Sequence, residues 1–241
     1  MDLQQLSEQI KNLDSKVWAA ILAAIASLIA TLLNYINQRK ILRIQSRSLE
    51  NTINEQKKNQ YYCQLKDFYY PFKHYLSESA RLYIVFRSGL PKDFRTLLYL
   101  IDNNYLFTDA SGNKQAATIS QKKMKILNEI LVIEDELCKL IIEKGGIIDD
   151  ESLCDIYMPN KNITDIVLNF DPNQPQDLPK DISLLSLFMV HCKLMKLAIN
   201  GELEKDNIGI YMNYVYPREL NKKLDENIKK IKNNIDSIKK I

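Results

Sequence analysis

The sequence predicts a mainly α-helical protein, in which an N-terminal transmembrane helix continues into a helical stalk. A mostly helical cytosolic domain with a C-terminal coiled-coil-like helix follows. Three observations predict this class. Residues 17–38 carry no formal charge and are rich in Ala, Ile and Leu. Residues 121–144 place apolar side chains at three- and four-residue steps, the period of an amphipathic helix. Residues 220–238 repeat Leu and Ile with the spacing of a coiled-coil seam.

The uncharged segment is long enough to cross a bilayer. Between Val17 and Leu33 the only polar side chains are Ser27 and Thr31. Extending the helix to residue 36 gives about 30 Å, the thickness of the hydrocarbon core. A helix satisfies its own backbone polar groups, which lipid cannot do. We therefore expect residues 17–36 to be a transmembrane helix.

A cleaved signal peptide is the alternative interpretation of this segment. Ala24-Ile25-Ala26 has the small-x-small form of a cleavage site. Apolar sequence continues past it to Leu33, whereas a cleavage site should already lie in polar sequence. The pattern therefore favours a retained anchor.

Basic residues follow the span and set its expected orientation. Before it, Lys11 and Lys16 are offset by Glu8 and Asp14. After it come four basic residues, Arg39, Lys40, Arg43 and Arg47. The first acidic residue after the span is Glu50. Lys and Arg near a span stay in the cytoplasm. We expect residues 1–16 to be a short extracytoplasmic tail, and the C-terminal domain to lie on the cytoplasmic side of the cell (inner) membrane.

The cysteines agree with a reducing compartment. The four cysteines are Cys63, Cys138, Cys154 and Cys192. No two of them are spaced closely enough to indicate a disulfide framework or a zinc site.

One face of the predicted span carries small residues. Ala19, Ala23, Ser27 and Thr31 recur every four residues, and Asn34 belongs to a neighbouring row with Ala26 and Ala30. Small residues at this spacing allow helices to approach closely in lipid. We expect the spans to pack in a homo-oligomer through this face, with Ser27, Thr31 and Asn34 as candidate pore-lining residues. Alanine as a plain helix former is the alternative.

Residues 37–60 are polar, free of Gly and Pro, and predict a basic helical stalk. A dense aromatic block follows at residues 61–75, in which Pro71 should kink or interrupt the helix. The helical pattern resumes to Phe86 and stops at Ser88-Gly89-Leu90-Pro91. Residues 61–241 have the length of one mostly helical domain.

The remaining elements follow from spacing and from Gly and Pro. We expect a short helix over residues 92–103, a turn at residues 109–113, and a helix over residues 121–144 that ends at Gly145-Gly146. Four prolines exclude a long element from residues 147–180. Asp181 is the predicted N-cap of a helix that ends near Asn200 and Gly201. Short strands are alternatives at residues 163–170 and 208–215. Pro217 introduces the last helix, whose predicted seam is Leu220, Leu224, Ile228, Ile231, Ile235 and Ile238.

Catalytic and metal-binding patterns are missing from the sequence. His74 and His191 are the 2 histidines, and neither lies in a zinc-ligand spacing. His191 falls in an apolar helix, where we expect a satisfied core histidine. The acidic runs at residues 134–136 and 149–151 are interpreted as solvated surface. With only 6 glycines there is no phosphate-cradling loop. We expect neither an enzyme nor a bound cofactor or metal.

Basic and aromatic residues come together around the stalk. Aromatic rings beside cations can stack bases and neutralise phosphates. The candidate ligand-binding residues on this hypothesis are Arg39, Lys40, Arg43, Arg47, Lys57, Lys58, Tyr61, Tyr62, Lys66, Tyr69 and Lys73. Two plainer alternatives remain open. The arginines lie where they would contact anionic lipid, and the tyrosines have the composition of a core. A net charge of +3 is too small to argue for nucleic acid by itself.

A short tail, one span, a basic stalk and the segment Tyr61-Tyr62-x-x-Leu65-x-x-Phe68-Tyr69-x-Pro71-Phe72 characterise residues 1–90. This arrangement looks like single-pass bacterial membrane proteins, some of which are effectors of anti-phage defence. It resembles the Hailong-type effector, a helical membrane protein held inactive by a nucleic-acid oligomer. Together with this resemblance, the small-residue face joined directly to a helical stalk predicts a homo-oligomer. We expect it to sense a ligand such as a nucleotide or nucleic-acid oligomer and to permeabilise the membrane, with lipid as its other partner. The alternative is a membrane-tethered scaffold that recruits a cytosolic protein through coiled-coil surfaces.

Overall fold

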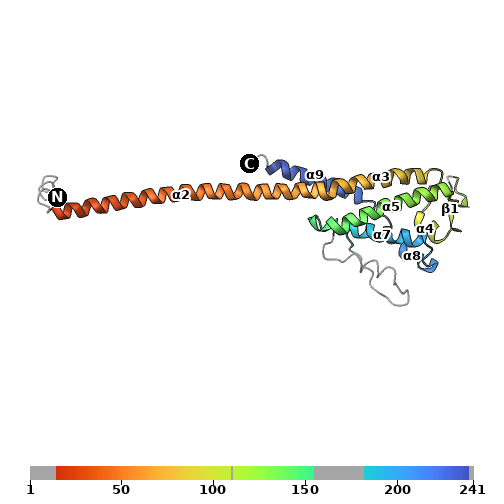
Figure 1. Cartoon of the computed structure of the whole chain (residues 1–241). Coiled ribbons are helices and arrows are strands. Elements are labelled where there is room, and N and C mark those ends of the chain that lie inside the picture. The colour runs from red at the N-terminus through yellow and green to blue at the C-terminus, as the bar shows by residue number, and fades with distance from the viewer. Residues whose placement is uncertain (1–14, 110, 155–181, 239–241) are drawn as a thin grey trace. The chain divides into compact units, whose positions relative to one another are not determined.

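The computed structural model describes residues 15–109, 111–154 and 182–238 (Figure 1). The fold is mainly α, as predicted. The chain divides into two compact units, residues 1–57 and 58–241. The first helix, α2 (Ser15–Cys63), contains the boundary between them.

The described part of the first unit is helical, and the apolar side chains of residues 17–36 are exposed on its surface. Its most apolar 18-residue window has a mean hydropathy of 2.1 and is 0% buried, so this helix is long and apolar enough to cross a membrane. Leu22 and Leu28, for example, are 63% and 70% exposed. The Thr31 hydroxyl donates to the Ser27 carbonyl at 2.8 Å. That bond satisfies the hydroxyl proton of Thr31 within the helix itself.

The second unit begins at a widened turn just before Pro71. Residues Gln64–Tyr69 form the π-helix η1, in which the Tyr70 N–H donates to the Leu65 carbonyl five residues earlier. A π-turn of this kind occurs mostly as a single wide turn inside a longer α-helical run. The predicted interruption at Pro71 therefore takes the form of a wider turn, and helix α3 (Tyr70–Arg87) follows directly.

In the next elements the predicted turns and helix ends agree with the structure more closely than the predicted helix lengths do. Helix α4 (Thr96–Ile101) is shorter than the expected helix over residues 92–103. The predicted turn at residues 109–113 joins two antiparallel strands that were not predicted, β1 (Leu106–Thr108) and β2 (Lys114–Ala116). Helix α5 (Gln121–Lys144) has the predicted bounds, with the Ser120 hydroxyl accepting from the Lys123 N–H. A short 3-10 turn, η2 (Gly145–Ile147), ends it.

The third long helix of the second unit starts later than expected. Ser183 caps α7 (Leu184–Ile199) by accepting from the Ser186 N–H. The Asp181 prediction is therefore wrong, and Asp181 lies outside the described residues. Gly201 ends the helix as predicted, with φ +71°. The strand alternative at residues 208–215 is also wrong, because η3 (Lys205–Asn207) and α8 (Ile208–Tyr211) are helical. The alternative at residues 163–170 lies outside the described residues.

Two apolar clusters hold this unit together, with α5 packed between α3 and α7 (Figure 1). The first joins the end of α3 and α4 to the N-terminal half of α5 and the C-terminal half of α7, and includes Phe86, Phe94, Phe107, Leu127 and Leu194. The second joins η1 to the other halves of α5 and α7 and to α9 (Leu220–Ile238), and includes Phe68, Phe72, Leu137, Phe188 and Leu224.

Helix α9 buries most of its apolar seam inside this second cluster. Leu220, Leu224, Ile231 and Ile235 are each at most 5% exposed. An ion pair between Lys73 Nζ and Asp225 Oδ1, 2.9 Å apart, joins α9 to α3. The helix forms as predicted, but its seam meets the aromatic side chains of η1 and is not open to a coiled-coil partner. A seam pattern fixes which face is buried and does not specify what covers it.

Candidate functional site

The basic and aromatic residues of the ligand hypothesis are divided between the two units of the chain. Arg39, Lys40, Arg43, Arg47 and Lys57 are exposed residues of the first unit, and Arg39 lies over the Tyr35 ring at 4.8 Å. In the second unit Tyr62 and Lys66 are exposed, whereas Lys58 and Tyr61 are half-buried. Lys73 is held by Asp225 and by the Asn221 side chain.

Tyr69 belongs to the core. It is 2% exposed and packs edge-on against Phe68, their ring centroids being 5.4 Å apart. Burial, with the nearby carboxylates of Asp150 and Asp149, holds the pKa of Tyr69 well above its usual value. The core alternative therefore describes Tyr69 correctly, and its ring is not available to stack on a ligand.

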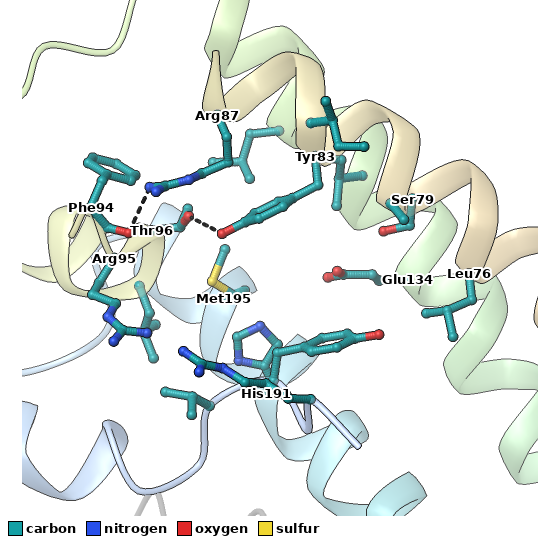
Figure 2. Close-up of a pocket in the computed structure, with 18 of the residues that line it drawn as sticks. Leu76, Ser79, Tyr83, Arg87, Phe94, Arg95, Thr96, Glu134, His191 and Met195 are labelled. Atoms are coloured by element: carbon teal, nitrogen blue, oxygen red, sulfur yellow. Dashed lines mark hydrogen bonds between the residues drawn. The ribbon is translucent and has the colours of Figure 1, made fainter. Parts of the chain in front are cut away.

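A cavity elsewhere in the second unit has the character of a binding site. Its volume is about 590 Å³, within the range of small-molecule pockets. Helices α3, α4, α5 and α7 and the segment before α9 enclose it (Figure 2). None of the basic and aromatic residues of the ligand hypothesis lines it. Apolar side chains make up much of the wall, among them Leu76, Leu127, Ile130 and Met195.

Glu134 of α5 is the buried acid of this cavity. Figure 2 shows its carboxyl group directed into the space between α3 and α7. The side chain is 7% exposed, and its Oε2 atom has no hydrogen-bond partner among the described residues. Burial raises the pKa of Glu134 to about 7, against the opposing effect of a bond from the Cys192 thiol.

His191 of α7 faces the same cavity. Its Nδ1 atom is buried without a partner in the described part of the chain. Burial lowers the pKa of His191 to about 4, although a bond to the Tyr214 backbone acts in the other direction. The ring is therefore neutral near pH 7. Since Nδ1 is unpaired, Nε2 carries the proton donated to the Tyr214 carbonyl, and Nδ1 presents a free lone pair.

Arginines surround the cavity. Arg87 is fixed by donating to the backbone carbonyl of Phe94 at 2.7 Å and to those of Pro91 and Lys92. Arg95 and Arg218 are exposed and line the cavity (Figure 2 labels Arg95). The structure gives neither an ion pair with any described residue. The mouth is thus cationic while the interior offers hydrogen-bond acceptors.

The sequence alone did not identify these residues. The acidic run at residues 134–136 was interpreted as solvated surface, which is wrong for Glu134. Its spacing carries the relevant pattern, because residue 134 continues the buried face of α5 at Leu127, Ile130, Leu131, Leu137 and Ile141. An acid at an apolar position of an amphipathic helix is costly to bury unless it is paired or neutral. His191 was expected to be a satisfied core histidine, yet one ring nitrogen has no partner among the described residues.

The described residues contain no group of three or more His, Cys, Asp or Glu able to hold a metal ion. The buried Cys192 thiol instead bonds with Glu134 and Cys138, and burial raises its pKa well above the usual value. No family model, curated protein or solved structure matches this chain.

Proposed function

We propose that this protein is a homo-oligomeric, single-pass membrane effector, acting in bacterial anti-phage defence, whose cytosolic helical domain senses a small ligand and gates membrane permeabilisation. The ligand site in this proposal is the cavity between α3, α5 and α7. The observation that carries it is an exposed apolar segment in the same chain as a cavity whose buried polar atoms include two without a partner among the described residues.

Solvent exposure of the first helix supports a membrane location. Burying apolar surface gains about 25 cal/mol per Å², and a soluble protein would place such side chains in its core. Here none of the most apolar window is buried. The basic residues from Arg39 to Arg47 follow the span, which supports a cytoplasmic location for the second unit.

The small-residue face supports association of the spans. Ala19, Ala23 and Ser27 leave room for a second helix backbone. The Thr31 hydroxyl is already bonded to the Ser27 carbonyl, so it can face either a helix or lipid without an unsatisfied proton. Close-packed spans are the element that a ligand-driven change in the second unit would rearrange.

Leakage of a dye or ion from expressing cells tests the proposal. We expect leakage with the native span and none when residues 17–36 are replaced by an unrelated poly-Leu anchor that inserts equally well. An inserted protein that never causes leakage would contradict it, and so would equal leakage from the poly-Leu variant. The scaffold alternative predicts that function survives the replacement; burial of the α9 seam gives it no support.

A further inference from the structure

We propose that the cavity binds a nucleotide, with the N–H edge of its base against Glu134 and His191 and its phosphate at Arg95 and Arg218. This inference rests on the proposed function only in taking the cavity as the ligand site. It moves the site away from the stalk residues, because Glu134 Oε2 and His191 Nδ1, two buried atoms without a partner among the described residues, belong to residues that line this cavity.

The inner wall of the cavity presents hydrogen-bond acceptors, so a complementary ligand carries hydrogen-bond donors. Glu134 Oε2 is buried without a partner among the described residues, and so is the free lone pair of His191 Nδ1. An unpaired buried acceptor costs free energy, which a ligand with N–H groups recovers. Guanine, adenine and cytosine each carry an exocyclic amino group, and guanine adds a ring N–H beside it. Such an edge satisfies acceptors without bringing a charge into the interior.

The side walls fit a flat, polarisable ring. Tyr83 and Tyr216 line the cavity together with Met195, and Figure 2 shows Tyr83 and Met195 beside the space that Glu134 faces. The Tyr83 hydroxyl is held by Thr96 at 3.4 Å. Aromatic faces stack on bases of any sequence, and thioether sulfur adds favourable contacts with rings.

The mouth supplies the charge that a phosphate needs. Arg95, Arg218 and Lys92 are exposed lining residues. Asp93 is the other acid of the lining, and both of its carboxylate oxygens accept from the Thr108 N–H, which holds it in place. Arg87 bonds only to carbonyl groups in the described structure, so its charge is not neutralised by an acid there. Arginine is well suited to phosphate because its planar group donates in pairs.

Two other ligand classes match the cavity less completely. A polyamine would satisfy Glu134 and His191 but would meet arginines at the mouth. A fatty acid would suit the apolar wall and the arginines but would leave both acceptors unpaired. The cavity volume of about 590 Å³ suits one mononucleotide and is too small for a folded polymer.

Calorimetric titration of the full chain in detergent tests the proposal, with GMP, AMP, CMP, the matching nucleosides, spermidine and oleate as probes. We expect at least one nucleotide to bind, and its nucleoside to bind about tenfold or more weakly. Glu134→Gln should weaken the nucleotide and the nucleoside alike. Arg95→Ala and Arg218→Ala should weaken the nucleotide only. Arg81→Ala, which removes an exposed arginine of α3 that does not line the cavity, is the matched control.

Three results would overturn it. The first is no nucleotide binding by protein whose circular dichroism shows it folded. The second is nucleotide binding that Glu134→Gln and Arg218→Ala leave unchanged, which would place the site elsewhere. The third is tight binding of spermidine or oleate instead.

The proposed function is judged separately, by leakage from cells that express Ala80→Trp. Ala80 is an exposed residue at the cavity wall, so the bulky ring blocks the site without disturbing the core. If this variant loses leakage while no nucleotide binds, the effector proposal stands and only the ligand class is wrong.

Discussion

Glu134 on α5 and His191 on α7 face one cavity, and each keeps a buried polar atom without a partner among the described residues. Burial acts on them in opposite directions. It raises the pKa of Glu134 to about 7 and lowers the pKa of His191 to about 4. Both groups are therefore driven toward their neutral forms, and each makes stability depend on pH with the opposite sign.

Glu134→Gln should make the protein more stable than wild type above neutral pH and change its stability in acid little. The native pKa of Glu134 is raised, so its contribution is fully present below about pH 4.5 and is lost as pH rises to about 7. The size of the effect is on the order of 3 kcal/mol. Thermal unfolding at pH 5 and pH 8 measures it: the variant should gain stability relative to wild type at pH 8. A difference that does not change with pH would show that the carboxyl is not buried in this way. Asp135 and Lys196, an ion pair beside it, remain in both proteins.

His191→Gln should give the reverse profile. The native pKa of His191 is depressed, so its contribution is present above about pH 6.5 and is lost as pH falls toward 4. Glutamine keeps an N–H donor for the Tyr214 carbonyl but does not titrate. Relative to wild type, the variant should be stabilised at pH 5 and not at pH 8. Since the two groups act oppositely, their combined contribution to the stability of the wild-type protein should vary little between pH 5 and 7. Identical profiles for wild type and His191→Gln would contradict the buried, neutral ring.

The sequence was sufficient to predict a helix where apolar spacing and helix-end residues agree. Apolar spacing and Gly145-Gly146 predicted a helix over residues 121–144, and these bounds coincide with α5. The β1–β2 hairpin has only three residues in each strand and carries little apolar alternation, so only its turn was recognisable. Tertiary packing decided what sequence spacing leaves open, namely that η1 covers the seam of α9.

The candidate site shows the same division. Glu134 occupies an apolar position of a helix whose pattern was recognised, so the sequence contained enough to single it out. The arginines at the mouth could not be recognised from the sequence, because Arg95 and Arg218 are far apart in it and share no pattern. Their approach to one cavity is a consequence of how α4 and the segment before α9 fold against α3 and α7.

Leu224→Ala should destabilise the second unit. Leu224 is 0% exposed in the cluster between η1 and α9, and truncating a buried leucine costs about 2–5 kcal/mol. Chemical unfolding of the full chain in detergent measures the loss. Lys230→Ala on the same helix is the control, because Lys230 is exposed and its removal should change stability by less than about 0.5 kcal/mol. Equal effects of the two changes would mean that the seam of α9 is not part of the core.

Ala23→Leu should weaken self-association of the protein. A leucine at the centre of the small-residue face keeps backbones apart, whereas Leu28→Met conserves size and polarity elsewhere on the span. Cross-linking of the two variants in vesicles at equal protein density measures association. Loss of oligomers in Ala23→Leu alone is the expected result. Unchanged oligomers in both would assign the contact to another surface.

Partition of the full chain between membrane and water tests directly whether the apolar helix crosses a membrane. Membranes from expressing cells are extracted at alkaline pH, and the pellet and supernatant are compared for wild type and for an Ala23→Arg, Ile29→Arg double variant. Each arginine at the centre of a span costs about 2.5–3.5 kcal/mol of insertion. We expect wild-type protein in the membrane pellet and the double variant in the supernatant. Wild-type protein that is soluble without detergent would contradict the central claim that the apolar helix crosses a membrane.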